Sequence, residues 1–355
     1  MKRFRMNVLL LVMSLILSGC SATKIEKFSV RLIEDEMFDT VVTFITYMED
    51  EQEFDQYTEE LKKEYAYYHK LYDKYHAYPG INNIRTINEA AGVSEVVVDQ
   101  EIIDLLVFAK KMYTETNQKS NIAIGAVLEV WHDYRDRYSD VYDYPKENME
   151  SEIPSLELLE SRRDHISIED MVIDDEKNTV FLKDPEMSID VGGVAKGYAT
   201  ELISRKFIDK GLENFVISAG GNVRVHGYSY GNDGKKRPWN TGLTDPFNQS
   251  NPSIANVSIT TGSVVTSGDY ERFYWHEQKR YSHIIDGDTL FPGFNFAQIT
   301  VYVEDSGVAD YLSTELFLLP YEEGMALAEK FDAEVFWVYH DGTTRATSDF
   351  FKVKN

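Results

Sequence analysis

The sequence has a single cysteine, Cys20, among 355 residues, and it is poor in positive charge. One cysteine excludes an intramolecular disulfide and a metal site built from several cysteines. Asp and Glu number 60 against 36 Lys and Arg, which gives a formal net charge of −24. Binding to nucleic acid needs a basic face, so this balance argues against a nucleic-acid partner. It also keeps the molecule off anionic membrane surfaces unless a covalent anchor holds it there.

Sequence motifs that identify several common enzyme classes are absent as well. The chain has no HExxH, no CxxC and no Walker A spacing, so zincin, zinc-ribbon and P-loop interpretations lose their main support. It also has no internal repeat, no low-complexity tract and no linker that would divide it. With 43% hydrophobic and 27% charged residues, the chain can bury one large core or two modest ones.

The first residues resemble a bacterial lipoprotein leader. A basic Met1–Arg5 segment precedes a short apolar run over 7–17, which is too short to span a bilayer and fits a secretory signal. The ending Leu17-Ser-Gly-Cys20 resembles a lipobox, in which cleavage leaves the cysteine acylated; an ordinary signal peptide is the alternative. The mature protein is then held by a lipid on the extracytoplasmic face of the cell membrane. We expect a signal peptide over 1–19, a lipid-anchored linker over 20–34 and one domain over 35–355.

Hydrophobic periodicity and turn residues indicate interleaved helices and strands, which favours a single α+β domain. Helices are predicted over 50–75, 101–114 and 308–319, and after the glycines near 196. Strands are predicted over 38–47, 171–182 (a hairpin), 212–221, 239–243, much of 254–303, 336–339 and 347–353. Residues 121–131 suit a helix or a loop over a pocket, and 133–165 suit a polar surface excursion.

The chain is organised around a glycine-rich stretch from Asp190 to Ile203. Glycines at 192, 193 and 197 remove side chains where the backbone must approach something closely. The helix that follows directs its free N–H groups to the same place. A buried strand after this helix runs into a second glycine pair at 220 and 221. Two such turns indicate a pocket for a phosphate-bearing ligand, although a tight helix–strand joint without a ligand would need the same glycines.

Two further groups of side chains could carry chemistry. His283 and Asp286 lie close together on or beside a predicted strand. Asp310 and Thr314 are four residues apart on a predicted helix, so they share one face of it. A carboxylate and a hydroxyl are hard oxygen ligands of the kind that Mg²⁺ accepts. Taken alone, each group also suits a structural role, as a histidine at a strand edge or an aspartate near a helix start.

Five separated segments occur together in an order that resembles the ApbE family, the FAD:protein FMN transferases. They are Asp190-x-Gly-Gly-x-Ala-Lys-Gly-Tyr, Ser218-Ala-Gly-Gly-Asn, Thr266-Ser-Gly-Asp-Tyr-Glu-Arg, Ser282-His-Ile-Ile-Asp and Ala309-Asp-x-x-Ser-Thr. Phe38-Asp-Thr resembles the entry motif of the family, and the resemblance covers roughly residues 35–350. It implies a single ApbE-like (T-fold-like) α+β domain with mixed or antiparallel sheets and packed helices.

The resemblance also implies a reaction and a set of site residues. FAD is cleaved at its pyrophosphate, FMN is joined by a phosphoester to a Thr or Ser of an acceptor protein, and AMP leaves. His283 would be the general base, with a pKa near neutrality, and Asp286 would orient it. Mg²⁺ would be bound by Asp310, Thr314 and the backbone carbonyl of Gly193. FAD would be bound by Phe38, Tyr78, Lys119, Ser120, Asn121, Asp190, Lys196, Ile284 and Ser313.

Two segments depart from the family pattern. Ser120–Ala126 stands where the family has Phe-Asp-Pro-Thr-x-Gly-Pro, and Asp286-Gly-Asp-Thr-Leu290 stands where it has Asp-Pro-x-Thr-Gly. Two other functions stay open: a metal-dependent FAD pyrophosphatase, in which water is the acceptor, and a lipoprotein that binds flavin without chemistry. A pure binder has no need for a base beside a metal, so His283 and the Asp310–Thr314 pair distinguish these classes.

Overall fold

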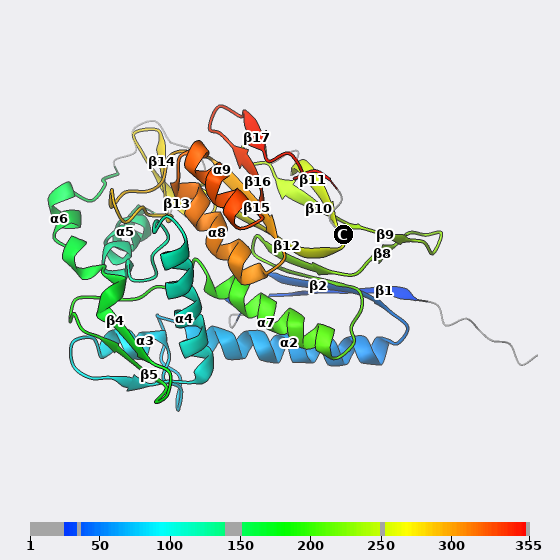
Figure 1. Ribbon diagram of the computed structural model, residues 1–355, viewed down its shortest axis with the longest axis horizontal. Helices are drawn as coiled ribbons and strands as arrows, with labels where there is room; N and C mark the ends of the chain where they lie inside the picture. Colours follow the sequence, from blue (N-terminus) through cyan, green and yellow to red (C-terminus); the bar gives the residue numbers. More distant parts are fainter. Residues whose placement is uncertain (1–24, 34–36, 139–150, 249–252, 353–355) are drawn as a thin grey trace, which may run out of the picture.

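The computed structural model describes residues 25–33, 37–138, 151–248 and 253–352. Its largest sheet has eight antiparallel strands in the order β1-β2-β6-β7-β12-β15-β16-β17 (Figure 1). Together with its helices, this sheet confirms the predicted α+β class. The strands are β1 (Glu26–Leu32), β2 (Val42–Met48), β6 (Phe215–Ala219), β7 (Asn222–His226), β12 (Thr261–Gly268), β15 (Gln298–Val303), β16 (Glu334–Val338) and β17 (Thr344–Ala346).

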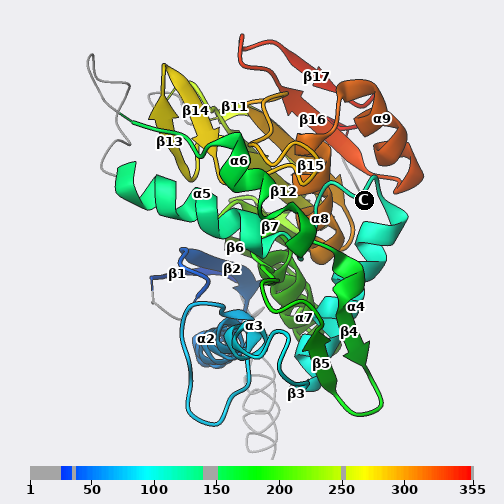
Figure 2. The same ribbon diagram turned by 90° about the vertical axis from the view of Figure 1, so that its left-hand side faces the viewer.

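Three helices cover one face of this sheet, and a hairpin covers the other. Helices α2 (Glu51–Tyr72) and α7 (Ala195–Asp209) lie side by side below the sheet (Figure 2). Helix α8 (Ser306–Leu318) packs beside α7 and on β12 and β15. The hairpin consists of β10 (Trp239–Thr244) and β11 (Ser253–Ile259). The sheet therefore separates two hydrophobic cores.

Residues of the central strands alternate between these cores, as the two-residue period of a strand requires. Phe215 and Ile217 of β6 lie in the core beneath the helices. Val216 lies between them in sequence and joins Trp239 and Leu243 of the hairpin in the opposite core. Burial on both faces explains why this strand reads as an unbroken hydrophobic run in the sequence.

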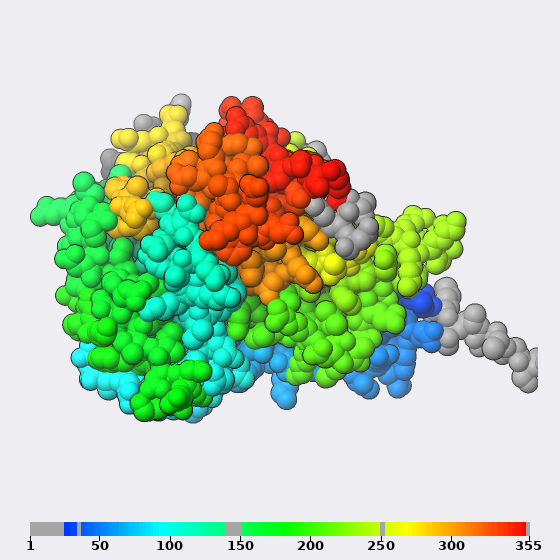
Figure 3. Space-filling model, viewed as in Figure 1, coloured from blue at the N-terminus to red at the C-terminus, as the bar shows by residue number. Residues whose placement is uncertain are grey.

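Shorter elements complete the described chain. They are α3 (Ile84–Glu89), β3 (Val96–Val97), α4 (Gln100–Glu115), α5 (Gly125–Tyr138), α6 (Leu156–Glu160), 3-10 turns at Arg163–His165 and Ile168–Asp170, β4 (Met171–Asp174), β5 (Thr179–Leu182), β8 (Ser229–Tyr230), β9 (Lys236–Arg237), β13 (Phe273–His276), β14 (Lys279–Ser282) and α9 (Tyr321–Lys330). The predicted hairpin over 171–182 is confirmed as β4 and β5. Lys330 Nζ of α9 donates to the Glu115 carbonyl of α4 at 2.5 Å across 215 residues, and these regions share one surface in Figure 3.

The structure corrects the predicted boundary between linker and domain. Strand β1 lies within the expected linker over 20–34 and pairs with β2 from Glu26–Met48 to Leu32–Val42. The Phe28 ring stacks on Phe54 of α2 at 5.3 Å, and Leu32 is buried. Alternation of Phe28, Val30 and Leu32 gives β1 an apolar face, so the folded domain begins before residue 35.

The predicted signal peptide over 1–19 and Cys20 lie outside the described residues. Within the described ranges, no helix combines the length and the apolar character that crossing a membrane requires.

Three other predicted boundaries also differ. Strand β2 begins at Val42 rather than at 38, because Phe38 and Asp39 have φ values of +55° and +52°, in the left-handed region. Residues 348–351 form a turn rather than a strand, and the Phe350 N–H donates to the Thr347 carbonyl at 3.3 Å. The segments 121–131 and 133–165 contain α5, which continues to Tyr138, and then α6.

We expect the Phe28→Ala variant to unfold more easily than the unchanged protein. The half-buried ring stacks on Phe54, so its loss should lower the free energy of unfolding by about 1–3 kcal/mol. Urea unfolding followed by tryptophan fluorescence measures this difference. Ser29→Ala, at an exposed neighbouring position of β1, is the matched control and should change the value by less than about 0.5 kcal/mol. Unchanged stability of Phe28→Ala would mean that β1 behaves as a linker.

Candidate active site

A cavity of about 390 Å³ lies where the end of α2, the segment before α5, the glycine turn before α7, and α8 meet. This volume is within the range of about 300–1,000 Å³ that is typical of small-molecule sites. The cavity brings together residues that are far apart in the sequence. Ten of the predicted site residues line it: Phe38, Ser120, Asn121, Asp190, Gly193, Lys196, His283, Ile284, Asp310 and Thr314.

The glycine turn is shaped by Asp190. Its Oδ1 accepts the Gly192 N–H at 2.8 Å, and its Oδ2 lies 2.7 Å from Lys74 Nζ, which comes from the segment directly after α2. Both side chains of this ion pair are mostly buried, with 14% of Asp190 and 11% of Lys74 exposed. Burial alone would raise the pKa of Asp190, but the Lys74 ammonium and the Gly192 N–H outweigh it and hold this pKa below its usual range. Asp190 is therefore a fixed anion that ties the turn to α2.

The first turn of α7 packs directly against α8. The Gly197 N–H donates to Asp310 Oδ2 at 2.7 Å. A Cβ atom at Gly197 would lie 2.4 Å from Asp310 Cβ and 2.4 Å from the Ser306 carbonyl oxygen, so only glycine permits this approach. On the same side, a Cβ atom at Gly193 would lie 3.5 Å from Thr314 Oγ1. Gly193, Asp310 and Thr314 therefore form one group, as the sequence predicts.

The chemistry of this group suits a hard cation. Burial raises the pKa of the Asp310 carboxyl, and Lys196 and the Gly197 N–H offset this effect only in part. A carboxylate, a hydroxyl and an accessible backbone carbonyl are oxygen donors that Mg²⁺ accepts together with waters or phosphate oxygens. The described residues contain no cluster of three or more His, Cys, Asp or Glu side chains arranged to hold a metal. Any cation here would thus be held by one carboxylate, with the Thr314 hydroxyl, the Gly193 carbonyl and waters or phosphate oxygens as its other ligands.

His283 faces the same cavity beside β14. Its backbone N–H donates to the Arg272 carbonyl at 2.9 Å, and its Nδ1 lies 3.2 Å from the same oxygen. Because a carbonyl only accepts, Nδ1 carries the proton of the neutral ring and Nε2 keeps its lone pair. Burial, with the positive charges of Arg272, Arg135 and Lys196, lowers the pKa of His283 to about 3. This corrects the expectation of a near-neutral pKa.

Asp286 lies in a different contact from the one expected. Its carboxylate oxygens are each 3.3 Å from Lys119 Nζ, and Oδ1 accepts the Asp288 N–H at 2.8 Å. The contact that orients the His283 imidazole comes instead from the Arg272 carbonyl. Asp286 therefore anchors Lys119, and it does so next to the segment that contains Ser120 and Asn121.

Three predicted FAD-binding residues lie outside the cavity lining. Lys119 is held in the ion pair with Asp286. The Tyr78 hydroxyl donates to Asp73 Oδ2 at 2.8 Å, and Asp73 lines the cavity. Ser313 is fully buried, and its Oγ lies 2.7 Å from Ser267 Oγ and donates to the Asp310 carbonyl at 2.9 Å. Tyr78 and Ser313 therefore contact lining residues from behind, whereas Lys119 contacts Asp286, which does not line the cavity.

Five basic residues of the cavity were not among the predicted site residues, and one of them, His69, accepts the Phe38 N–H through its Nδ1 at 3.2 Å. Lys74 pairs with Asp190, and Arg272 carries the carbonyl that holds His283. His132 and Arg135 lie on the face of α5 that lines the cavity. Burial, with Lys74 and Arg135 nearby, lowers the pKa of His132 to about 4, so its ring is neutral at pH 7. The spacing of 128, 132 and 135 along one helix face is the sequence signal that could have indicated this wall.

Helix α8 also holds the segment that departs from the family pattern. Glu315 accepts the backbone N–H groups of Lys119 and Ser120, at 3.2 and 2.6 Å. The Tyr311 hydroxyl donates to the Ser120 carbonyl at 2.5 Å. One helix thus carries Asp310 and Thr314 towards the cavity and fixes the backbone of the opposite wall.

Comparison with known proteins identifies the family of the chain. A model of the ApbE family matches residues 38–337. A protein of Treponema pallidum named FAD:protein FMN transferase is 30% identical over 271 residues, which cover 75% of this chain and 73% of the relative. A protein of the same name from Klebsiella pneumoniae is 29% identical over 259 residues, 72% of this chain and 75% of the relative.

Solved structures share the fold. The ApbE protein of Thermotoga maritima has a TM-score of 0.75 and 24% identity, over 92% of this chain and 100% of that chain. The flavin transferase ApbE of Vibrio cholerae has a TM-score of 0.73 and 22% identity, over 92% of this chain and 99% of that chain. Since the family model spans most of the sequence, the chain belongs to the ApbE family.

Proposed function

We propose that the protein is an FAD:protein FMN transferase, which moves FMN from FAD to a Thr or Ser hydroxyl of an acceptor protein. The observation that carries the proposal is one cavity that joins a neutral imidazole, a carboxylate–hydroxyl pair and a glycine turn. Relatives over most of the chain carry this name. In the reaction, a bond forms between the acceptor oxygen and the phosphorus of the FMN half. The pyrophosphate bond breaks, and AMP leaves.

His283 is the group suited to accept the proton of the acceptor hydroxyl. Its Nε2 has a free lone pair, because Nδ1 is bound to the Arg272 carbonyl. With its pKa lowered to about 3, the ring is unprotonated throughout the neutral pH range. Such a base is unprotonated, and so able to accept a proton, at every pH near neutrality, but its low pKa means that it attracts the proton only weakly. It therefore depends on close positioning of the hydroxyl, which the fixed ring orientation favours.

The basic residues of the cavity are suited to bind a diphosphate. Lys196, Arg135 and Arg272 all line the cavity, and the charge of each lowers the pKa of His283. A protein with a net charge of −24 would otherwise repel an anionic dinucleotide. Phosphoryl transfer depends mainly on positioning and on neutralising phosphate charge. These basic residues would do both.

We propose Mg²⁺ as the metal, with Asp310, Thr314 and the Gly193 carbonyl as the residues that would hold it. When bound, Mg²⁺ supplies charge neutralisation to the phosphate oxygens. The supporting observations are the proximity of Gly193 to Thr314 and the incomplete compensation of the buried Asp310 carboxylate.

Hydrolysis of FAD and simple flavin binding are the outcomes that would replace this proposal. A pyrophosphatase would use the same cavity, with water in place of the acceptor hydroxyl. A binding protein would need the diphosphate contacts but no imidazole with a free Nε2. Incubation with FAD, Mg²⁺ and an acceptor domain separates the three: a fluorescent acceptor band supports transfer, free FMN and AMP support hydrolysis, and unchanged FAD supports binding alone.

We also propose that a lipid on Cys20 anchors the protein on the extracytoplasmic face of the cell membrane. The proposal is supported by the basic start, the short apolar run and the Leu-Ser-Gly-Cys ending of the leader. Its acceptor would then also be a protein of the membrane or of the space outside it.

We expect His283→Ala to bind FAD but to lose transfer by about 10²–10⁴-fold, the usual contribution of a general base. The assay compares the rate of acceptor labelling with the FAD dissociation constant measured by flavin fluorescence. His165→Ala is the control, because His165 pairs with Asp184 outside the cavity lining. Full transfer activity in His283→Ala would remove His283 from the role of base.

Asp310→Asn should raise the Mg²⁺ concentration needed for half-maximal transfer by at least about tenfold, because it removes the one carboxylate of the proposed site. A magnesium titration of the transfer rate, started from EDTA-treated protein, measures this change. Asp233→Asn, in the exposed turn before β9, is the control and should leave the titration unchanged. A titration of Asp310→Asn that matches the unchanged protein would exclude Asp310 as a ligand.

Cys20→Ser should release the protein from the membrane fraction, because the acylated residue is lost. Fractionation of cells and mass spectrometry of the mature N-terminus test this. A protein that stays in the membrane fraction after the substitution, or a mature N-terminus without a lipid, would contradict the anchor.

A further inference from the structure

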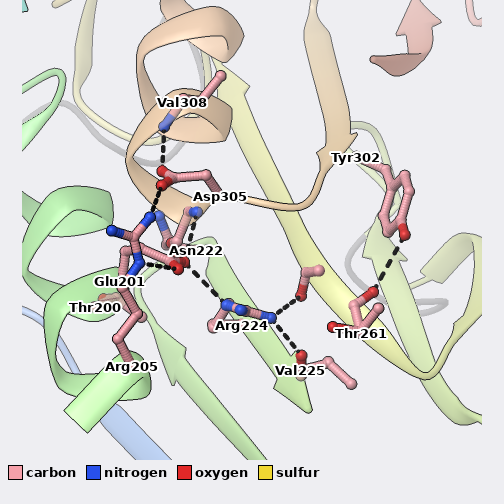
Figure 4. Close-up of polar contacts among 12 residues, drawn as sticks. Thr200, Glu201, Arg205, Asn222, Arg224, Val225, Thr261, Tyr302, Asp305 and Val308 are labelled. Carbon is pink, nitrogen blue, oxygen red and sulfur yellow. Dashed lines mark hydrogen bonds and ion pairs between the residues drawn. The ribbon is translucent and has the colours of Figure 1, made fainter. Parts of the chain in front are cut away.

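The start of α8 rests on a buried ion pair that lies outside the cavity lining (Figure 4). Glu201 of α7 and Arg224 of β7 are joined by Nε and Oε2 at 2.9 Å, and only 7% and 4% of their side chains are exposed. A buried ion pair contributes little net stability, because removing both charges from water costs about as much as their attraction returns. Its position therefore needs another explanation.

Glu201 binds the first residue of α8. Its Oε2 also accepts the Ser306 N–H at 2.9 Å. The first N–H groups of a helix have no partner within the helix, so this contact fixes where α8 begins relative to α7. Asp310 lies one turn further along α8. Glu201, which accepts the first N–H of α8, thus acts with the N-cap residue Asp305, whose Oδ1 accepts the Val308 N–H at 2.9 Å, to fix the position of the proposed metal ligand along the helix.

Arg224 connects this contact to the sheet. Its Nη1 donates to the Val225 carbonyl at 2.6 Å and to the Gly262 carbonyl at 3.4 Å, on neighbouring strands. Asn222 at the start of β7 adds a second link, because its Oδ1 accepts the Ser306 hydroxyl at 2.7 Å. A rigid sheet, α7 and the start of α8 are thereby joined at one point.

We propose that Glu201 and Arg224 are positioning residues for the metal site, which hold the Asp310 carboxylate at the level of Gly193. This rests on the metal site of the proposed function. The Gly197 N–H and Asp310 meet at 2.7 Å, with no room for a Cβ atom between the helices. A small shift of α8 along α7 would therefore separate Asp310 and Thr314 from the Gly193 carbonyl. Neither residue of the pair has to touch the cation to control its affinity.

The test measures cation binding directly, with Mn²⁺ as the probe and EPR spectroscopy as the readout, on full-length protein without FAD. Glu201→Gln removes the charge and keeps the shape, whereas Arg224→Lys keeps the charge but loses the planar fork. We expect both variants to weaken Mn²⁺ binding by about 10–100-fold. The control is Arg237→Gln, because Arg237 of β9 forms an ion pair with Asp233 (Nη2 to Oδ1, 3.2 Å), is 59% exposed and makes no contact with the start of α8 that this proposal uses. Its Mn²⁺ affinity should stay within about twofold of the unchanged protein.

Thermal unfolding of the same samples separates positioning from stability. Weaker Mn²⁺ binding by folded Glu201→Gln, at temperatures well below its Tm, supports the proposal. A lower Tm with unchanged Mn²⁺ affinity would overturn it and leave the pair a structural role. If Glu201→Gln does not fold, the same comparison of Mn²⁺ affinity with Tm is made on Arg224→Lys. This variant keeps a positive charge beside Glu201, so it leaves no unpaired charge in the protein interior. Asp310→Asn with unchanged Mn²⁺ affinity would instead overturn the metal site itself.

Discussion

The close approach of α7 and α8 is the constraint on which the candidate site depends. Gly197 has no side chain, so the Asp310 carboxylate reaches its N–H at 2.7 Å. The same approach brings Thr314 beside Gly193 and leaves the Asp310 carboxylate buried at one wall of the cavity. Burial of a carboxylate is unfavourable without compensation, and the pKa of Asp310 is raised accordingly. The fold thus holds a partly compensated anion where a cation and phosphate oxygens would complete it.

Charge is distributed in a way that the net charge does not reveal. The chain as a whole is strongly acidic, yet Lys74, Arg135, Lys196 and Arg272 all line one cavity. Asp190 uses Lys74 to fix the glycine turn, while the other three act on His283. The acidic surface therefore disfavours binding to nucleic acid or anionic lipid, and the basic wall makes one place available to a small polyanion. An acidic protein can in this way be selective for a dinucleotide without being a general anion binder.

The parts of the fold that sequence predicted correctly are those set by local signals. The β4–β5 hairpin follows from turn residues, and Asn178 there has a φ of +52°, which asparagine tolerates well. The incorrect boundaries depend on distant contacts. Phe38 reads as a strand residue, but its N–H donates to His69 Nδ1 on α2 and its backbone is left-handed. Phe350 reads as part of a last strand, but its ring stacks on Phe336 at 5.6 Å from within a turn.

The contrast between local signals and distant contacts also explains which parts of the candidate site could be predicted from the sequence. The Asp310–Thr314 pair was predictable from its spacing on one helix face, and its grouping with Gly193 was implied by the resemblance to the ApbE family; packing brings Thr314 beside Gly193. The orientation of His283 was not predictable, because Asp286 is three residues away in sequence but is bound to Lys119. Asp286 could orient the His283 imidazole only if no cation bound its carboxylate. Lys119, which comes from a distant segment of the chain, is such a cation. The Arg272 carbonyl takes the place of this carboxylate because β13 and β14 form a hairpin that brings residue 272 opposite residue 283. A backbone carbonyl fixes the tautomer of His283 as a carboxylate would. Because a carbonyl carries no full negative charge, it raises the pKa of the imidazole less than a carboxylate would, and the base is weaker.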